Sequence, residues 1–194
     1  MTIVREGANL AKEPRDDIAF TQGAKPSHTA PLPPDITAAR LRAAGAALRT
    51  AQIAGALDSI AAMTVAYTTQ RIQFGKPIAK FQAVQQSAAV LAEQTAAAGA
   101  AADMAAEAFA SGIDINAIAA AKTFAGDAAG IGAGLAHQLH GAIGFSREYA
   151  LNHRTRRLWS WRDEYGNDTD WAALLGSHLA RAGAASLWTE ISAL

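Results

Sequence analysis

"RIQFGKPIAKFQ", residues 71–82, separates two long runs of small apolar residues and decides how the chain folds back on itself. Its Lys-Pro step must break a helix, because proline has no backbone N–H and clashes with the preceding turn. A plain corner between two helices needs only the Gly and the Pro. This corner also carries Arg71, Phe74 and Gln82, which a turn does not require.

The three extra residues favour a binding site. Arg71 alone has a simple explanation, since a cation at a helix C-terminus is stabilised by the helix dipole. That explanation does not extend to Phe74 or Gln82. A guanidinium pairs with phosphate through two hydrogen bonds, and an aromatic ring packs on a flat ligand. Together they indicate a site for a planar, anionic molecule.

The composition predicts a helical protein. Hydrophobic residues make up 51% of the 194 residues, but aromatic residues only 7%. Alanine is abundant, and alanine has the highest helix propensity of all residues. A chain of this length can bury the core of one domain. We therefore expect an all-α, antiparallel helical bundle, preceded by a short extended or β segment.

Charge and cysteine content exclude several classes of function. Lys+Arg and Asp+Glu are equal at 17 each, so no overall field attracts nucleic acid or an anionic membrane. The absence of cysteine excludes disulfides, thiolate metal sites and a cysteine nucleophile. No apolar run reaches the roughly 18 residues that a bilayer span requires. We expect a soluble, cytoplasmic protein without bound metal.

The chain divides at a proline-rich stretch. Residues 1–34 contain two short, partly alternating runs and end in "APLPPD", which predicts two strands and a linker. Two strands alone are marginally stable, so this segment should lie on something else. Residues 35–194 are expected to form the bundle domain. Its expected helices cover residues 35–70, 81–111, 114–140, 148–159 and 168–185.

Helix caps and faces support these ranges. Asp35 and Asp114 are predicted N-caps, and Gly141 stands where a helix-ending glycine belongs. Apolar residues recur at helical spacing in the first helix (Ile53, Leu57, Ile60, Thr64, Tyr67) and in the third (Ile118, Phe124, Ile131, Leu135).

Three glycines in the third helix, Gly126, Gly130 and Gly134, are spaced by four. A lipid-facing interpretation is excluded by Asp127 and His137 in the same helix. Each glycine should instead mark a close contact, inside the bundle or with another chain.

A second constellation is "HQLHGAIGF", residues 137–145. Gln138 lies in the last helical turn, and Gly141 and Ala142 open a loop of small residues that lets the backbone approach a ligand. The Gly-x-x-Gly pattern follows a helix instead of opening one, so it fits neither a P-loop nor a Rossmann turn. His137 and His140 are three residues apart, but the Glu-x-x-His pattern of di-iron bundles is absent.

Together these stretches resemble the C-terminal helical domain of the acyl-CoA dehydrogenase family. The family pattern is R-x-x-F-G…Q, then A-K-x-F-A-x-D, then Q-x-x-G-G-x-G. This chain has "RIQFGKPIAKFQ", "AKTFAGD" and "HQLHGAIGF" in the same order, within a match over about residues 36–185. The resemblance implies contacts to the pyrophosphate and adenosine half of FAD, usually that of a neighbouring subunit, from Arg71, Phe74, Gln82, Gln138, Gly141 and Ala142.

The resemblance also shows what this sequence lacks. Residues 1–34 resemble only the end of the family's middle β domain, and nothing here resembles its N-terminal helical domain. The family's catalytic glutamate, which removes the substrate α-proton, aligns with Tyr165 or, in some members, with Gly45. Tyrosine, with a pKa of about 10, is a poor base at neutral pH. Glu164, one residue before Tyr165, is the remaining candidate catalytic base.

Two functions follow as hypotheses. The first is a subunit of a flavin-dependent acyl-CoA dehydrogenase in fatty acid or lipid metabolism, which supplies an FAD corner to a partner subunit within a dimer or tetramer. The second is a degenerate helical module that assembles but does not catalyse. A fragment of a longer dehydrogenase is the remaining alternative. The arginines of "HRTRRLWSWR", residues 153–162, are expected to lie on a solvated helix face instead of binding RNA.

Overall fold

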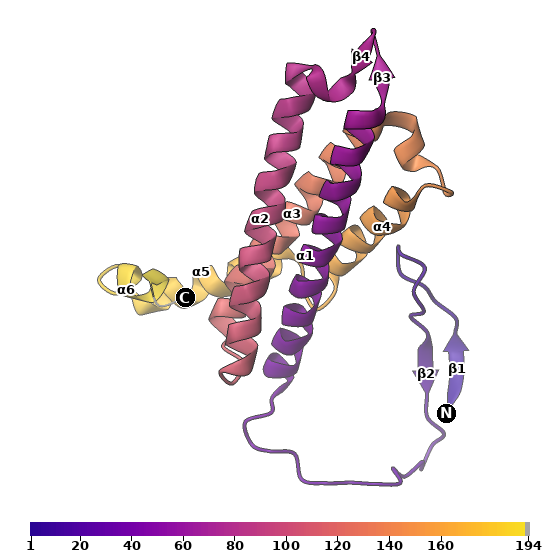
Figure 1. Ribbon diagram of the computed structural model, residues 1–194. Coiled ribbons are helices and arrows are strands. Elements are labelled where there is room, and N and C mark those ends of the chain that lie inside the picture. The colour runs from indigo at the N-terminus through magenta and orange to yellow at the C-terminus, as the bar shows by residue number, and fades with distance from the viewer. Residues whose placement is uncertain (193–194) are drawn as a thin grey trace.

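The computed structural model describes residues 1–192. Three long helices form its centre: α1 (Ala38–Gln70), α2 (Gln82–Ala110) and α3 (Ile115–His140). They pack against one another as an antiparallel bundle (Figure 1). Helix α4 (Ala150–Asp163) covers α1 and α3, and α5 (Asp168–Ala182) packs on α3 before the short α6 (Leu187–Ser192). The predicted all-α bundle is confirmed.

Small side chains allow the three long helices to approach closely. Most of the buried residues of α3 are alanines or glycines, and they pack against Ile53, Leu57 and Ile60 of α1. At Gly132 an added Cβ would lie 2.6 Å from Leu57 Cδ2, closer than any side chain tolerates. The α1–α3 contact therefore depends on the absence of a side chain at position 132.

The spaced glycines of α3 differ from one another. An added Cβ at Gly126 would lie 2.9 Å from Asp168 Cβ, and one at Gly130 would lie 2.9 Å from Arg162 Nη1. At Gly134 nothing lies within 4 Å. Close contacts inside the chain are thus confirmed for Gly126 and Gly130, while at Gly134 only the alternative of a contact with another chain stays open as a prediction.

The third helix also exposes residues that its periodicity placed on one face. Ile118 is fully buried, but Phe124 and Ile131 keep 62% and 46% of their surface exposed. The buried face of α3 is made of alanine and glycine, which bring the neighbouring helices too close to admit larger side chains. Phe124 and Ile131 consequently face outward, while Ile118 stays in the core.

Helix caps follow the sequence with one correction. Asp114 caps α3 by accepting hydrogen bonds from the backbone N–H groups of Asn116 and Ala117. The prediction that Asp35 caps α1 was wrong by two residues. Thr37 is the N-cap and accepts from the Arg40 N–H, while the Asp35 carboxylate accepts from the Arg40 guanidinium at 3.3 Å.

Both C-terminal helices have bounds other than those expected. Helix α4 continues four residues beyond the predicted end at Trp159. The last predicted helix is divided, because Gly183 ends α5 with a φ of 85°. Within residues 1–192 no helix is long and apolar enough to cross a bilayer, and no three His, Cys, Asp or Glu side chains gather as a metal site would require.

The N-terminal segment forms a small hairpin. Strand β1 (Thr2–Arg5) pairs antiparallel with β2 (Asp17–Ala19), and both strands are exposed. The loop between them, residues 6–16, lies against α4 (Figure 1). An extended linker then leads to α1. The marginal hairpin is therefore supported by the bundle, as the sequence predicted.

Candidate functional site

The corner after α1 is a miniature hairpin instead of a plain turn. Strands β3 (Ile72–Gln73) and β4 (Lys76–Pro77) pair antiparallel and project beyond the helix ends (Figure 1). The two residues between them, Phe74 and Gly75, have φ values of 53° and 78°. Positive φ at both central positions is typical of a type I′ turn, which matches the twist of the strands. A Phe-Gly pair was the available signal for this hairpin, and sequence reasoning missed it.

The turn holds Phe74 in solvent. Its side chain is 90% exposed, and its ring meets the ring of Phe81 edge-on at 6.0 Å. The ammonium of Lys76 lies 4.5 Å from the centre of the Phe81 ring. A large apolar ring kept in water forgoes about 1.5–3 kcal/mol of burial. A hairpin that presents such a ring is suited to meet a ligand or another chain.

Arg71 is fixed by its backbone but free at its side chain. Its N–H donates to the Tyr67 carbonyl, and its own carbonyl accepts from the Ile78 N–H, both at 2.8 Å. Among the described residues no carboxylate pairs with the Arg71 guanidinium, which is exposed. The N–H groups of this guanidinium thus remain available to an anion.

A groove of about 530 Å³ lies between this corner and the end of α3. Its walls come from the end of α1, the hairpin, the start of α2 and the loop after α3. The structure brings five predicted site residues to these walls: Arg71, Phe74, Gln138, Gly141 and Ala142. Gln82 is the exception. It is the first residue of α2, and its side chain does not line the groove.

Two aromatic rings, those of Tyr67 and His140, also line the groove. Tyr67 stacks on His140 with 4.5 Å between ring centres, and its hydroxyl donates to the His140 carbonyl at 3.2 Å. Nδ1 of His140 donates to the Ala136 carbonyl. The other ring nitrogen, Nε2, is buried and has no partner among residues 1–192. Burial lowers the pKa of His140, partly offset by that hydrogen bond. The ring is therefore neutral at pH 7.

The side chain of His137 is not available as a second binding group beside His140. Its Nε2 lies 2.8 Å from the Thr155 hydroxyl, and its ring is stacked between Phe145 and Trp159. Both histidines are buried, His137 against α4 and His140 beside the groove.

The positions where the family places its catalytic base lie elsewhere. Tyr165 and Gly45, far apart in sequence, meet in space: an added Cβ at Gly45 would lie 2.3 Å from Tyr165 Cδ1. The Tyr165 carbonyl accepts from Arg42 and from Trp171, which holds the residue at a φ of 59°. The ring of the residue at one aligned position, Tyr165, therefore fills the space next to the other, Gly45.

Glu164 is engaged by the N-terminal loop and by α1. Its carboxylate accepts from Arg15 at 2.6 Å and from Asn9 at 3.0 Å, and it forms an ion pair with Arg49. Burial raises the pKa of Glu164, but these hydrogen bonds and the charge of Arg49 outweigh it, and the net pKa is lowered. The carboxylate is ionised, yet its oxygens are already occupied by donors.

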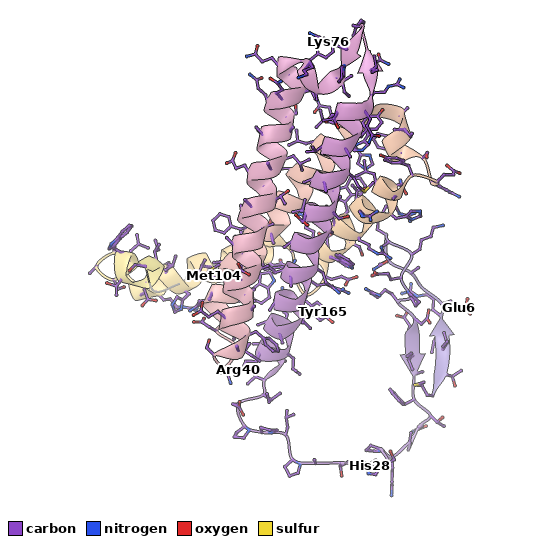
Figure 2. All side chains as sticks on the ribbon, in the orientation of Figure 1. Glu6, His28, Arg40, Lys76, Met104 and Tyr165 are labelled. Atoms are coloured by element: carbon purple, nitrogen blue, oxygen red, sulfur yellow. The ribbon has the colours of Figure 1, made fainter. Side chains whose placement is uncertain are left out.

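The two regions are at opposite ends of α1. Twenty-six residues separate Gly45 from Arg71, which corresponds to about 40 Å along a helix. Figure 2 shows the same separation, with Lys76 at the tip of the hairpin and Tyr165 near the other end of α1. One bound molecule cannot reach both regions of the same chain.

Comparisons with known proteins identify the family of this bundle. Residues 36–162 match the family model described as "Acyl-CoA dehydrogenase, C-terminal domain". Over 122 residues the chain is 39% identical to 3-sulfinopropanoyl-CoA desulfinase from Paraburkholderia xenovorans (strain LB400). The aligned stretch covers 61% of this chain and 29% of that protein.

Solved structures have the same bundle. Butyryl-CoA dehydrogenase from Megasphaera elsdenii superposes with a TM-score of 0.68 at 29% identity, over 73% of this chain and 38% of that one. The ChsE4–ChsE5 complex from Mycobacterium tuberculosis gives a TM-score of 0.64 at 26% identity, over 74% of this chain and 40% of that one. The chain spans less than a third of the length of the curated relatives that it matches.

Proposed function

This chain belongs to the acyl-CoA dehydrogenase family, and from that membership we propose that it is a subunit of a flavin-dependent acyl-CoA dehydrogenase. In this proposal it supplies the corner that holds the pyrophosphate and adenosine half of an FAD bound mainly by a partner subunit. The observation that carries the proposal is the groove, where Arg71, Phe74 and Gln138 meet around a loop of small residues.

Each of these residues suits that half of the cofactor. The unpaired Arg71 guanidinium would hold the pyrophosphate, and the exposed Phe74 ring would pack on a flat base. The Gln138 amide can donate and accept at the same edge, while Gly141 and Ala142 let the backbone come close. Lys76 adds a second positive charge beside the groove. When bound, FAD supplies the acceptor for the hydride that leaves the substrate β-carbon.

The remaining parts of the reaction are assigned to the partner. Neither Gly45 nor Tyr165 is a carboxylate, the Glu164 oxygens are engaged by Arg15, Arg49 and Asn9, and this region lies about 40 Å from Arg71. A base within hydrogen-bond reach of the thioester α-proton must therefore come from another subunit. We propose that residues 1–34 correspond to the end of a β domain that the partner has in full. The relatives named above carry CoA thioesters in their names, which supports an acyl-CoA substrate.

One observation favours a second candidate, a helical module that assembles without catalysing. The ring of Tyr165 fills the space beside both base positions, and the Glu164 oxygens are occupied. In that case the groove would bind no flavin. Titrating FAD into the protein with and without its partner separates the two candidates, because only the first acquires flavin when the partner is present.

The decisive experiment is co-expression with a full-length acyl-CoA dehydrogenase from the same genome. We expect a yellow complex whose FAD affinity falls by about 1.5–3 kcal/mol in Arg71→Ala, the usual contribution of a charged hydrogen bond. The matched control is Arg181→Ala, which removes an exposed guanidinium on α5. Full flavin affinity in Arg71→Ala, or an equal loss in the control, would contradict the assignment of this corner.

A further inference from the structure

A second, smaller cavity lies on the opposite side of α4 from the bundle core, between the start of α4 and the N-terminal loop. Its volume is about 260 Å³, and its lining residues are Ala11, Lys12, Arg147, Asn152, His153 and Arg156. None of them belongs to the FAD groove. Three of the six side chains are permanent cations, and none is acidic.

The three cations lack an anionic partner in the part of the chain that the structure describes. Within residues 1–192 no carboxylate forms an ion pair with Lys12, Arg147 or Arg156. Their acidic neighbour Glu13 is directed elsewhere, toward Arg15 and Arg157. Like charges around one cavity repel each other. Because the chain as a whole is neutral, this cluster is a local feature and not a consequence of a basic composition.

The other arginines of this region differ in this respect. Arg154 donates to the Ser59 hydroxyl at 2.7 Å, and Arg162 pairs with Asp168 at 2.8 Å. These side chains hold helices together. Arg156 also has a structural bond, from Nε to the Leu10 carbonyl at 2.7 Å, but its two terminal nitrogens have no partner in the described chain. The terminal groups that face the cavity remain available.

Hydrogen bonds form the cavity in advance. Nε2 of His153 donates to the Arg147 carbonyl at 2.9 Å, which ties the loop before α4 to its first turn. The bond from Arg156 to Leu10 fixes the N-terminal loop on the same helix. Asn152 and His153 belong to the first turn of α4, where the helix dipole is positive. The backbone around the cavity is therefore fixed before an anion binds.

Lys12 occupies a backbone position that disfavours it. Its φ is 62°, in the left-handed region that glycine and asparagine tolerate best. The Lys12 N–H donates to the Asn9 carbonyl at 2.9 Å, which closes a tight turn. A glycine would make this turn with less strain. The lysine therefore costs stability in the free protein, and its contribution to the cavity is a positive charge.

We propose that this cavity binds a phosphate monoester, the terminal phosphate of a phosphorylated small molecule. A phosphate monoester carries about −1.5 to −2 charges at pH 7. That charge suits three cations better than the single negative charge of a carboxylate or a phosphodiester. The guanidinium forks of Arg147 and Arg156 can each bind two phosphate oxygens, and Lys12 supplies a mobile point charge.

The test is calorimetric titration of the full chain with methyl phosphate at constant ionic strength. The titration uses Arg71→Ala, so that the FAD corner does not contribute phosphate binding. We expect Arg147→Gln and Lys12→Gly to weaken methyl phosphate binding about tenfold each, since a hydrogen bond to a charged group is lost. Lys12→Gly also relieves the positive φ, so its melting temperature without ligand should be equal to or above that of the parent.

Controls separate this site from general charge effects. Lys25→Gly removes one exposed positive charge from the linker and should leave the affinity unchanged. Dimethyl phosphate, a monoanionic diester, should bind at least tenfold more weakly than methyl phosphate. The proposal is overturned if Lys12→Gly and Arg147→Gln bind methyl phosphate as tightly as the parent, or if Lys25→Gly loses as much. Equal binding of the diester, or tighter binding of a short single-stranded oligonucleotide, overturns the assignment to a monoester.

The result is independent of the proposed function. Failure of flavin binding at Arg71 would leave the methyl phosphate titration unaffected, because the two cavities share no residue.

Discussion

Tyr165 explains how this chain can keep the family fold without a carboxylate at either aligned base position. Its ring covers Gly45, and its backbone is held by hydrogen bonds from Arg42 and Trp171 to its carbonyl. A side chain at position 45 and the Tyr165 ring cannot both occupy this space. The two substitutions relative to the family pattern are therefore coupled physically, although 120 residues separate them in the sequence.

We predict that Gly45→Ala destabilises the fold by about 1–3 kcal/mol, because the added methyl overlaps the Tyr165 ring. Gly55→Ala is the matched control on the same helix. Nothing lies within 4 Å of that position, so the exchange should stabilise the protein by up to about 1 kcal/mol. Urea unfolding of the two variants measures both values. A Gly45→Ala protein as stable as Gly55→Ala would show that the ring moves aside freely.

At the scale of elements, Glu13 and Glu164 attach the N-terminal loop to the helices. Asn9 donates to both carboxylates, at 2.8 Å to Glu13 and at 3.0 Å to Glu164. The hydrogen bond from Asn9 lowers the pKa of Glu13, and the pKa of Glu164 is lowered as well. A carboxylate whose pKa is lowered by folding stabilises the folded state at every pH above its pKa in the unfolded chain, which is about 4.5 for glutamate. That stabilisation is lost as the pH falls through the lower, folded value.

We therefore predict that the loop detaches from the helices in acid, below about pH 4.5, while the bundle persists. Glu164→Gln should mimic this at pH 7 and reduce the hydrogen-exchange protection of residues 9–15 by about 1.5–3 kcal/mol, since charged hydrogen bonds are lost. Glu148→Gln, which changes a carboxylate that forms no ion pair in the described chain, is the control. Unchanged protection in Glu164→Gln would show that other contacts hold the loop.

At the scale of the whole molecule, two exposed apolar side chains of α3 lie in line with the groove beside Arg71. Phe124, Ile131 and Gln138 are spaced by seven on α3 and therefore lie on one face. Phe124 and Ile131 are exposed, and Gln138 lines the groove. The exposed Asp127 lies between them, so Phe124 and Ile131 are two separate apolar points on this face. In the complex that we propose, this face of α3 would contact the partner whose cofactor reaches Arg71.

We predict that Ile131→Asp weakens assembly with the partner dehydrogenase by at least tenfold in sedimentation velocity. FAD affinity should fall with it, although position 131 does not line the groove. The comparison variant is Leu48→Asp, at a residue that is 62% exposed on α1. Normal assembly of Ile131→Asp, or an equal defect in Leu48→Asp, would place the interface elsewhere.

The sequence alone determined the helical bundle, the cap at Asp114 and the break in the chain at residues 71–82. These features depend on interactions within a few residues of the chain, such as helical periodicity, capping side chains and the break at proline, and a local pattern records them. The motifs indicated the family, because their residues and their order can be recognised in the sequence without knowing the fold.

Only the tertiary structure decided which of these residues share one space. It left Gln82 outside the groove, turned Phe124 and Ile131 outward, and brought Tyr165 onto Gly45. It also gathered Lys12 with Arg147 and Arg156 from opposite ends of the chain. Such contacts depend on how closely alanine and glycine faces let helices approach and on where the loops then meet. That packing is settled by all the helices together, so no single stretch of sequence carries it.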